Sequence, residues 1–160
     1  MRATLRVVLD TNILMRGLIN SRSASGRVLA ACENRKLIPL LSLAVLVEYR
    51  GILTDPELVE RYPQLDEHRV KAVLERLSYV GDVIRRVQQR FRLPHDPRDS
   101  KLVELAIAAR ATHLISTDRD LLDLAIGRDD AARRFSRRLP GVAVIDPVEF
   151  WEGYGGIVGG

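Results

Sequence analysis

The sequence has very little cysteine and few aromatic residues. Cys32 is its one cysteine, so an internal disulfide and a cysteine-based zinc site are excluded. The histidines show no ligand spacing either; they are His68, His95 and His113. Aromatic residues make up 5% of the chain, which argues against the base-stacking platforms of single-strand-binding proteins.

Long hydrophobic runs are also missing, because none approaches the ~20 residues of a membrane span. The N-terminal stretch MRATLRVVLD has an apolar run that ends at once in an acid, and it is interpreted as a buried strand rather than a secretory signal. We therefore expect a cytoplasmic protein with no membrane contact.

What is present is a basic chain of 160 residues, of which 46% are hydrophobic. That length suits one domain with a real core. The net charge is +4, with most of the excess in arginine, and it favours a polyanionic partner such as nucleic acid. Residues 1–152 are expected to form a single domain. The glycine-rich residues 153–160 are expected to be a flexible tail.

Apolar strands alternate with amphipathic helices along the chain, which indicates an α/β sandwich with a mainly parallel sheet. Strands are expected at 5–9, 37–41, 113–116 and 141–145. Helices are expected at 25–34, 42–53, 56–62, 66–79, 96–111, 119–126 and 147–151. The pattern leaves 80–93 open between helix and strand, and 129–138 open between helix and loop.

Several acids fall where such a sheet would place a ligand site. Asp10 directly follows the first strand, and Asp118 follows the strand HLIS after one residue. In open parallel sheets, ligands bind beyond the carboxyl ends of the strands. Glu48 interrupts the apolar run LSLAVLVEY, and Asp99 lies in the first turn of a long helix. Asp96, followed by proline, fits the N-cap of that helix better than a chemical role.

Each of these acids also has a purely structural interpretation. Asp10 could cap a helix, and Glu48 could face solvent on an amphipathic helix. The role of Asp99 could be limited to a favourable interaction with the helix dipole. Asp118 lies nearer the strand end than Asp120, which could cap or face solvent. Taken together, however, gathered carboxylates repel one another unless a cation neutralises them. The hard ions Mg²⁺ and Mn²⁺ prefer oxygen ligands, so one of them is the expected cofactor.

These residues resemble the PIN-domain family. The similarity lies in VVLDTN at 7–12, the isolated Glu48, DPRDSKLVELAIAARATHLISTDRDLL at 96–122 and DPVEFW at 146–151. More narrowly, the chain resembles the VapC-like toxins of toxin–antitoxin pairs. The resemblance implies a Rossmann-like α/β/α sandwich, Mg²⁺- or Mn²⁺-dependent endoribonuclease activity, an antitoxin partner and a homodimer.

Carried over by resemblance, the catalytic acids and metal ligands are Asp10, Glu48, Asp99 and Asp118. The supporting positions given by the resemblance are Thr11, Asn12 and Ser116. Asp96, interpreted above as a helix cap, and Asp120, the less favoured alternative to Asp118, are further supporting candidates. The arginine-rich stretch before Asp96 departs from the pattern. Candidate arginines for RNA phosphates are Arg16, Arg119, Arg133, Arg134, Arg137 and Arg138.

The expected mechanism is attack on a phosphodiester by a metal-activated water. Glu48 is open between ligand and general base, and the number of ions is open between one and two. Two rival classes fit less well. A haloacid-dehalogenase-like phosphatase requires a second Asp at the position where this chain has Asn12. A non-catalytic Rossmann-like interaction domain that binds nucleotides wants a glycine-rich phosphate loop, and no such motif occurs.

Overall fold

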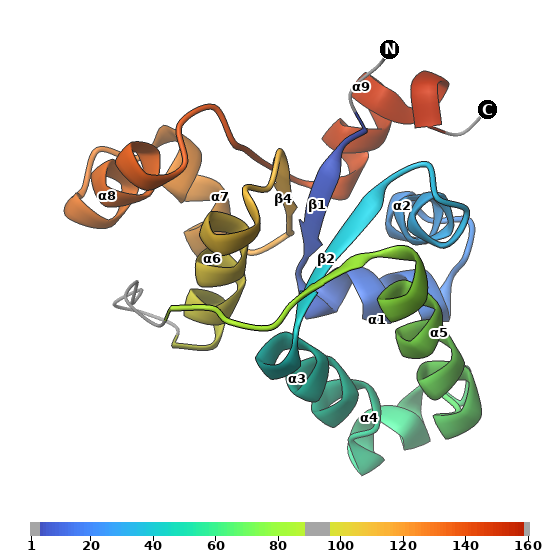
Figure 1. Cartoon of the computed structure of the whole chain (residues 1–160). Coiled ribbons are helices and arrows are strands. Elements are labelled where there is room, and N and C mark those ends of the chain that lie inside the picture. Colours follow the sequence, from blue (N-terminus) through green and yellow to red (C-terminus); the bar gives the residue numbers. More distant parts are fainter. Residues whose placement is uncertain (1–3, 89–96, 159–160) are drawn as a thin grey trace.

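A parallel sheet forms the centre of the molecule (Figure 1). The structure is a computed structural model that describes residues 4–88 and 97–158. In these residues the strands are β1 (Arg6–Leu9), β2 (Ile38–Ser42), β3 (Asp82–Ile84), β4 (His113–Ile115) and β5 (Ala143–Ile145). They lie in the order β3-β2-β1-β4-β5, and every neighbouring pair is parallel. The predicted α/β class is confirmed.

Helices cover both faces of this sheet. They are α1 (Thr11–Ile19), α2 (Ala24–Glu33), α3 (Leu43–Leu53), α4 (Pro56–Arg61), α5 (Glu67–Val80), α6 (Pro97–Ala109), α7 (Arg119–Ile126), α8 (Asp130–Arg138) and α9 (Pro147–Val158). Helix α6 contacts β1, β2, β3 and β4, while α2, α5 and α9 lie on the other side of the sheet (Figure 1). The apolar residues between these layers form one buried cluster, so the arrangement is the expected sandwich.

Local capping explains where several of these helices begin. The Ser42 hydroxyl accepts a hydrogen bond from the amide of Val45 at 3.2 Å, so the predicted cap of α3 is confirmed. Asp55 and Asp66 cap α4 and α5 in the same way. The residues 130–138, left open by the sequence pattern, form the helix α8.

Two short elements were not predicted. Helix α1 is built from TNILMRGLI, whose threonine, asparagine and glycine are weak helix formers. It forms because Ile13, Leu14 and Leu18 are buried on one side. Strand β3 lies within the segment 80–93, which the sequence pattern left open between helix and strand, and it pairs with β2. Its Asp82 forms a 2.9 Å salt bridge with Arg6.

The expectation of a flexible tail from Gly153 is wrong for residues 153–158. Helix α9 continues through them to Val158, which is buried. The ring of Tyr154 stacks on that of Phe150, and both rings make T-shaped contacts with the imidazole of His113. Burial against α2 and these ring contacts outweigh the low helix propensity of glycine.

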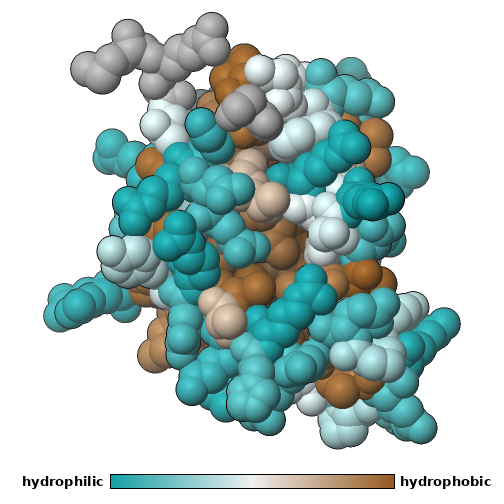
Figure 2. All heavy atoms as spheres, turned by 90° about the vertical axis from the view of Figure 1, so that its right-hand side faces the viewer, coloured by the Kyte–Doolittle hydropathy of each residue, from teal (hydrophilic) through white to brown (hydrophobic). Residues whose placement is uncertain are grey.

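The surface mixes polar and apolar residues. Figure 2 shows the face at the right of Figure 1, where apolar residues are visible between hydrophilic side chains. A pocket of about 470 Å³ lies between α3 and α5 and includes Leu43, Val47 and Leu74 in its lining. Among the described helices, none combines the length and apolar character needed to cross a membrane.

Candidate metal centre

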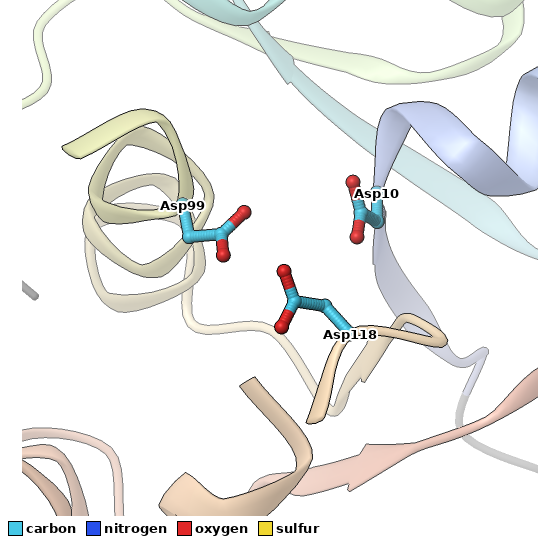
Figure 3. Close-up of side chains that lie close together, drawn as sticks. All are labelled: Asp10, Asp99 and Asp118. Atoms are coloured by element: carbon cyan, nitrogen blue, oxygen red, sulfur yellow. The ribbon is translucent and has the colours of Figure 1, made fainter. Parts of the chain in front are cut away.

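Three carboxylates from distant parts of the chain meet beside the end of β1. Asp10 follows β1, Asp118 lies three residues after the end of β4, and Asp99 is in the first turn of α6. Because β1 and β4 are paired, with Leu9 opposite Ile115, the first two acids emerge at the same edge. One oxygen from each carboxylate lies within 4.8 Å of the others, and the groups point toward one another (Figure 3). The structure thus brings Asp10 and Asp118 together at one edge of the sheet, where the sequence pattern placed them.

Ser116 connects two of these acids. Its hydroxyl is fully buried and donates a 2.6 Å hydrogen bond to Oδ2 of Asp10. The Oγ of Ser116 in turn accepts a 2.9 Å hydrogen bond from the amide of Asp118. A single serine therefore orients one carboxylate through its side chain and the other through the backbone.

The surroundings of Asp10 disfavour the negative charge of its carboxylate. Its side chain is buried, and burial raises the pKa of its carboxyl above the ordinary value. The hydrogen bond from Ser116 opposes that rise of the pKa, and the nearby charge of Asp118 adds to it. The backbone amides of Thr11 and Asn12 also act to lower the pKa of Asp10, although its side chain makes no capping hydrogen bond to α1. The cap interpretation therefore does not account for this acid, whereas a neighbouring cation would.

The donor set fits a hard divalent ion. All three groups offer carboxylate oxygen, which is the ligand type that Mg²⁺ and Mn²⁺ prefer. Oxygen ligands about 2.1 Å from one octahedral ion are separated by about 3 to 4 Å. Carboxylate oxygens within 4.8 Å can therefore reach one ion after small side-chain rotations.

Glu48 lies apart from this group. It is on α3, and its oxygens are not among those within 4.8 Å of one another. Its Oε2 lies 3.9 Å from Nζ of Lys101 on α6. The next residue, Tyr49, donates a hydrogen bond to the carbonyl of Leu9, which ties α3 to the end of β1. Burial raises the pKa of Tyr49, and the charge of Asp10 adds to this effect.

The other predicted positions are placed as follows. Asp120 is exposed and outside the cluster, and its amide donates to Oδ1 of Asp118 at 2.9 Å. Asp118 thus also caps α7. Thr11 is buried and Asn12 is exposed at the start of α1. Asp96, predicted as a cap, lies outside the described residues. The candidate arginines are all exposed; they are Arg16, Arg119, Arg133, Arg134, Arg137 and Arg138.

Sequence reasoning missed two charged residues of α6, Lys101 and Glu104. Glu104 is buried, and both residues line a pocket of about 330 Å³ that also includes Ser42. The pattern that singled out Glu48, an acid inside an apolar run, applies equally to Glu104 in KLVELAIAA. Lys101 becomes meaningful only through its pairing with Glu48, which sequence spacing does not reveal.

Comparison with known proteins agrees with this geometry. A PIN domain family model matches residues 6–120, a range that contains all four predicted acids. An uncharacterised protein of Methanocaldococcus jannaschii is 29% identical over 120 residues, which cover 75% of each chain. The search of solved structures returned no match. Because the family model covers well over half of the sequence, the chain belongs to the PIN-domain family.

Proposed function

We propose that this protein is an endoribonuclease that uses Mg²⁺ or Mn²⁺ to hydrolyse phosphodiester bonds in RNA. The observation that supports this most is the meeting of Asp10, Asp99 and Asp118 within 4.8 Å. PIN domains are typically nucleases, and a carboxylate cluster beyond the strand ends is suited to that chemistry. The basic net charge of +4 favours a polyanionic substrate.

In this proposal, Asp10, Asp99 and Asp118 hold the ion. The bound ion supplies a Lewis acid and lowers the pKa of a coordinated water. Ser116 keeps the carboxylate of Asp10 oriented through its 2.6 Å hydrogen bond. Tyr49 keeps α3, and with it Glu48, against the end of β1. The exposed arginines near the cluster, Arg16 and Arg119, would bind phosphates without selecting a base.

Cleavage of a labelled RNA with and without Mg²⁺ or Mn²⁺ tests the activity. We expect ion-dependent cleavage by the wild type, and a loss of at least a hundredfold in Asp10→Asn, Asp99→Asn and Asp118→Asn. Asp120→Asn is the matched control, because Asp120 is two residues from Asp118 but exposed and outside the cluster. Wild-type protein that cleaves equally well in a chelator would contradict the proposal. Equal loss in Asp120→Asn would contradict the assignment of the ligands.

We also propose that the ribonuclease is the toxin of a toxin–antitoxin pair and forms a homodimer. The support for this is the resemblance of VVLDTN and DPRDSKLVELAIAARATHLISTDRDLL to VapC-like toxins. Induced synthesis of the wild type should arrest growth of a bacterial host, whereas Asp10→Asn should not. Co-expression of a cognate antitoxin should restore growth, and light scattering should give twice the chain mass. Normal growth at high levels of folded wild-type protein would contradict the toxin role.

A further inference from the structure

A third pocket lies close to the acid cluster, because one of its lining residues directly precedes Asp118. It has a volume of about 320 Å³ and lies where the beginnings of α2 and α9 approach the loop before α7. The polar residues that line it are Arg16, Ser23, Ser25, Thr117 and Asp146. Thr117 joins this pocket to the candidate metal centre, because it directly precedes Asp118.

The α2 side of this pocket presents hydrogen-bond donors. The Ser23 hydroxyl accepts from the amide of Gly26, but the amides of Ala24 and Ser25 belong to the first turn, which has no intrahelical acceptors for them. Helix α2 is 10 residues long and has no acid in its first turn, so the positive end of its dipole is not neutralised there.

The side chain of Ser25 is a second and independent indication of a ligand. Ser25 is only 3% exposed and lines the pocket, and its hydroxyl makes no hydrogen bond to any other described residue. Its oxygen is not one of the fully buried side-chain atoms without a partner, so it remains accessible from the pocket. The hydroxyl is therefore available to a ligand that accepts or donates a hydrogen bond there.

Arg16 brings a full positive charge to the same pocket. It lies next to Gly17, and a Cβ at Gly17 would come within 3.2 Å of the backbone of Gly26 and Ser25. The absence of that Cβ lets α1 cross α2 closely enough to place Arg16 beside the beginning of α2. Among the residues that the structure describes, no acid forms an ion pair with Arg16, so its guanidinium is available to an anion.

Asp146 adds one acceptor to this set of donors. Its Oδ1 accepts a 2.9 Å hydrogen bond from the amide of Glu149, which leaves Oδ2 for a hydroxyl donor. A carboxylate would repel a simple anion. A ribonucleotide, however, carries both a phosphate, which accepts, and a ribose 2′-hydroxyl, which donates.

We propose that this pocket binds a ribonucleotide next to the scissile bond, with its phosphate on Arg16, Ser25 and the first turn of α2. Its 2′-hydroxyl donates to Asp146. The pocket thus helps this site to prefer RNA over DNA. The proposal rests on the proposed ribonuclease function, and it adds the residues that recognise the substrate.

Binding of a short fluorescent RNA, measured by anisotropy in a chelator, tests the pocket without cleavage. We expect Arg16→Gln to weaken binding about fivefold, and to reduce the slope of log affinity against log salt by about 0.7, the value for one lost phosphate contact on a single strand. Arg22→Gln is the control, because Arg22 is exposed on the loop between α1 and α2 and does not line the pocket. It should leave the slope unchanged.

Two further variants separate recognition from folding. Ser25→Ala should weaken RNA binding without lowering the melting temperature, since its hydroxyl has no hydrogen bond within the described protein to lose. Asp146→Asn keeps an oxygen for the amide of Glu149 but replaces the free acceptor, so it should weaken binding of RNA more than binding of DNA of the same sequence. An unchanged ratio of RNA to DNA affinity would overturn the role of Asp146.

The results for the pocket and for the nuclease are distinguishable. If Arg16→Gln binds RNA with the affinity and salt slope of the wild type, the pocket proposal is wrong, whether or not RNA is cleaved. If the slope falls as expected but no RNA is cleaved with Mg²⁺ or Mn²⁺, the pocket stands and the ribonuclease proposal fails.

Discussion

At the scale of single residues, Glu48 differs from the other three acids in its surroundings. It pairs with Lys101 at 3.9 Å and lies outside the group formed by Asp10, Asp99 and Asp118. We therefore expect Glu48→Gln to change the dissociation constant of Mn²⁺ less than threefold. The cleavage rate at saturating Mn²⁺ should fall by about 10² or more, because a general base has been removed.

Calorimetry and rates measured as a function of ion concentration separate these two effects. Glu67→Gln is a suitable control, because Glu67 is an exposed acid on α5. A large rise in the dissociation constant of Glu48→Gln, with a normal rate once Mn²⁺ is saturating, would make Glu48 a ligand instead.

His113 links stability to pH. Its ring is buried against Phe150 and Tyr154, and burial lowers its pKa below the ordinary value. In the unfolded chain the imidazole is protonated as the pH falls through about 6.5, whereas the folded protein resists protonation. The contribution of His113 to stability is therefore complete above that pH and is lost as the pH falls toward the folded pKa.

Urea unfolding between pH 7.5 and 5.5 measures this effect. The free energy of unfolding should fall with acidity by up to about 1.4 kcal/mol per pH unit through this one group. His113→Phe should make the dependence shallower, and His68→Gln, at an exposed position on α5, should not. Identical pH dependence in the wild type and His113→Phe would rule out His113 as the source.

At the scale of elements, the end of α9 gives a sharp test. Val158 is 5% exposed, whereas its neighbour Ile157 is 56% exposed. Val158→Ala should lower the free energy of unfolding by about 1–2 kcal/mol, since it removes buried methyl groups. Ile157→Ala should change it by less than about 0.5 kcal/mol. Equal and small effects in thermal melts would support a flexible tail after all.

The elements that could be predicted are those with strong local patterns. The strands before Asp10 and after Ala111, and the helices capped by Ser42 and Asp66, follow from apolar periodicity and caps. Helix α1 depends on packing against α2 and α3, strand β3 on pairing with β2, and α9 on packing against α2. Local helix propensity is weak in α1 and in the glycine-rich end of α9, and β3 is only three residues long, so the sequence alone does not predict these elements.

The candidate site likewise contains residues that the sequence could predict and residues that it could not. Asp10 and Asp118 could be predicted because a parallel sheet brings its strand ends to one edge. Asp99 joins them because α6 packs across the strands. The pairing of Glu48 with Lys101, the burial of Glu104 and the donors around Arg16 arise from helix packing, which periodicity does not specify.

At the scale of the whole molecule, an ion at the cluster should stabilise the fold. The three carboxylates repel one another, and a cation that binds only the folded protein removes that repulsion. At about 100 times its dissociation constant, Mn²⁺ should add roughly 2.7 kcal/mol. For a chain of this size, that corresponds to a rise in the melting temperature of about 5–10 °C.

Asp10→Asn should be stabilised less by the ion. The pKa of Asp10 is raised by burial, so ionising it at neutral pH costs folding free energy, and the variant should melt no lower than the wild type without metal. Its rise in melting temperature with Mn²⁺ should shrink. Scanning calorimetry over an Mn²⁺ series measures both effects. No shift in the wild type at millimolar Mn²⁺ would refute a metal centre here.

The hydrogen bond between Ser116 and Asp10 joins two residues that are added to the growing chain at widely separated times. Ribosomes make the chain from its N-terminus, so β1 emerges long before β4, which must pair with it. Until that pairing forms, Asp10 has neither Ser116 nor Asp118 beside it. A nascent or prematurely ended chain that stops before β4 therefore carries the first acid without a complete centre. Under the proposed nuclease function, activity would appear in the cell only when most of the polypeptide has been synthesised and folded.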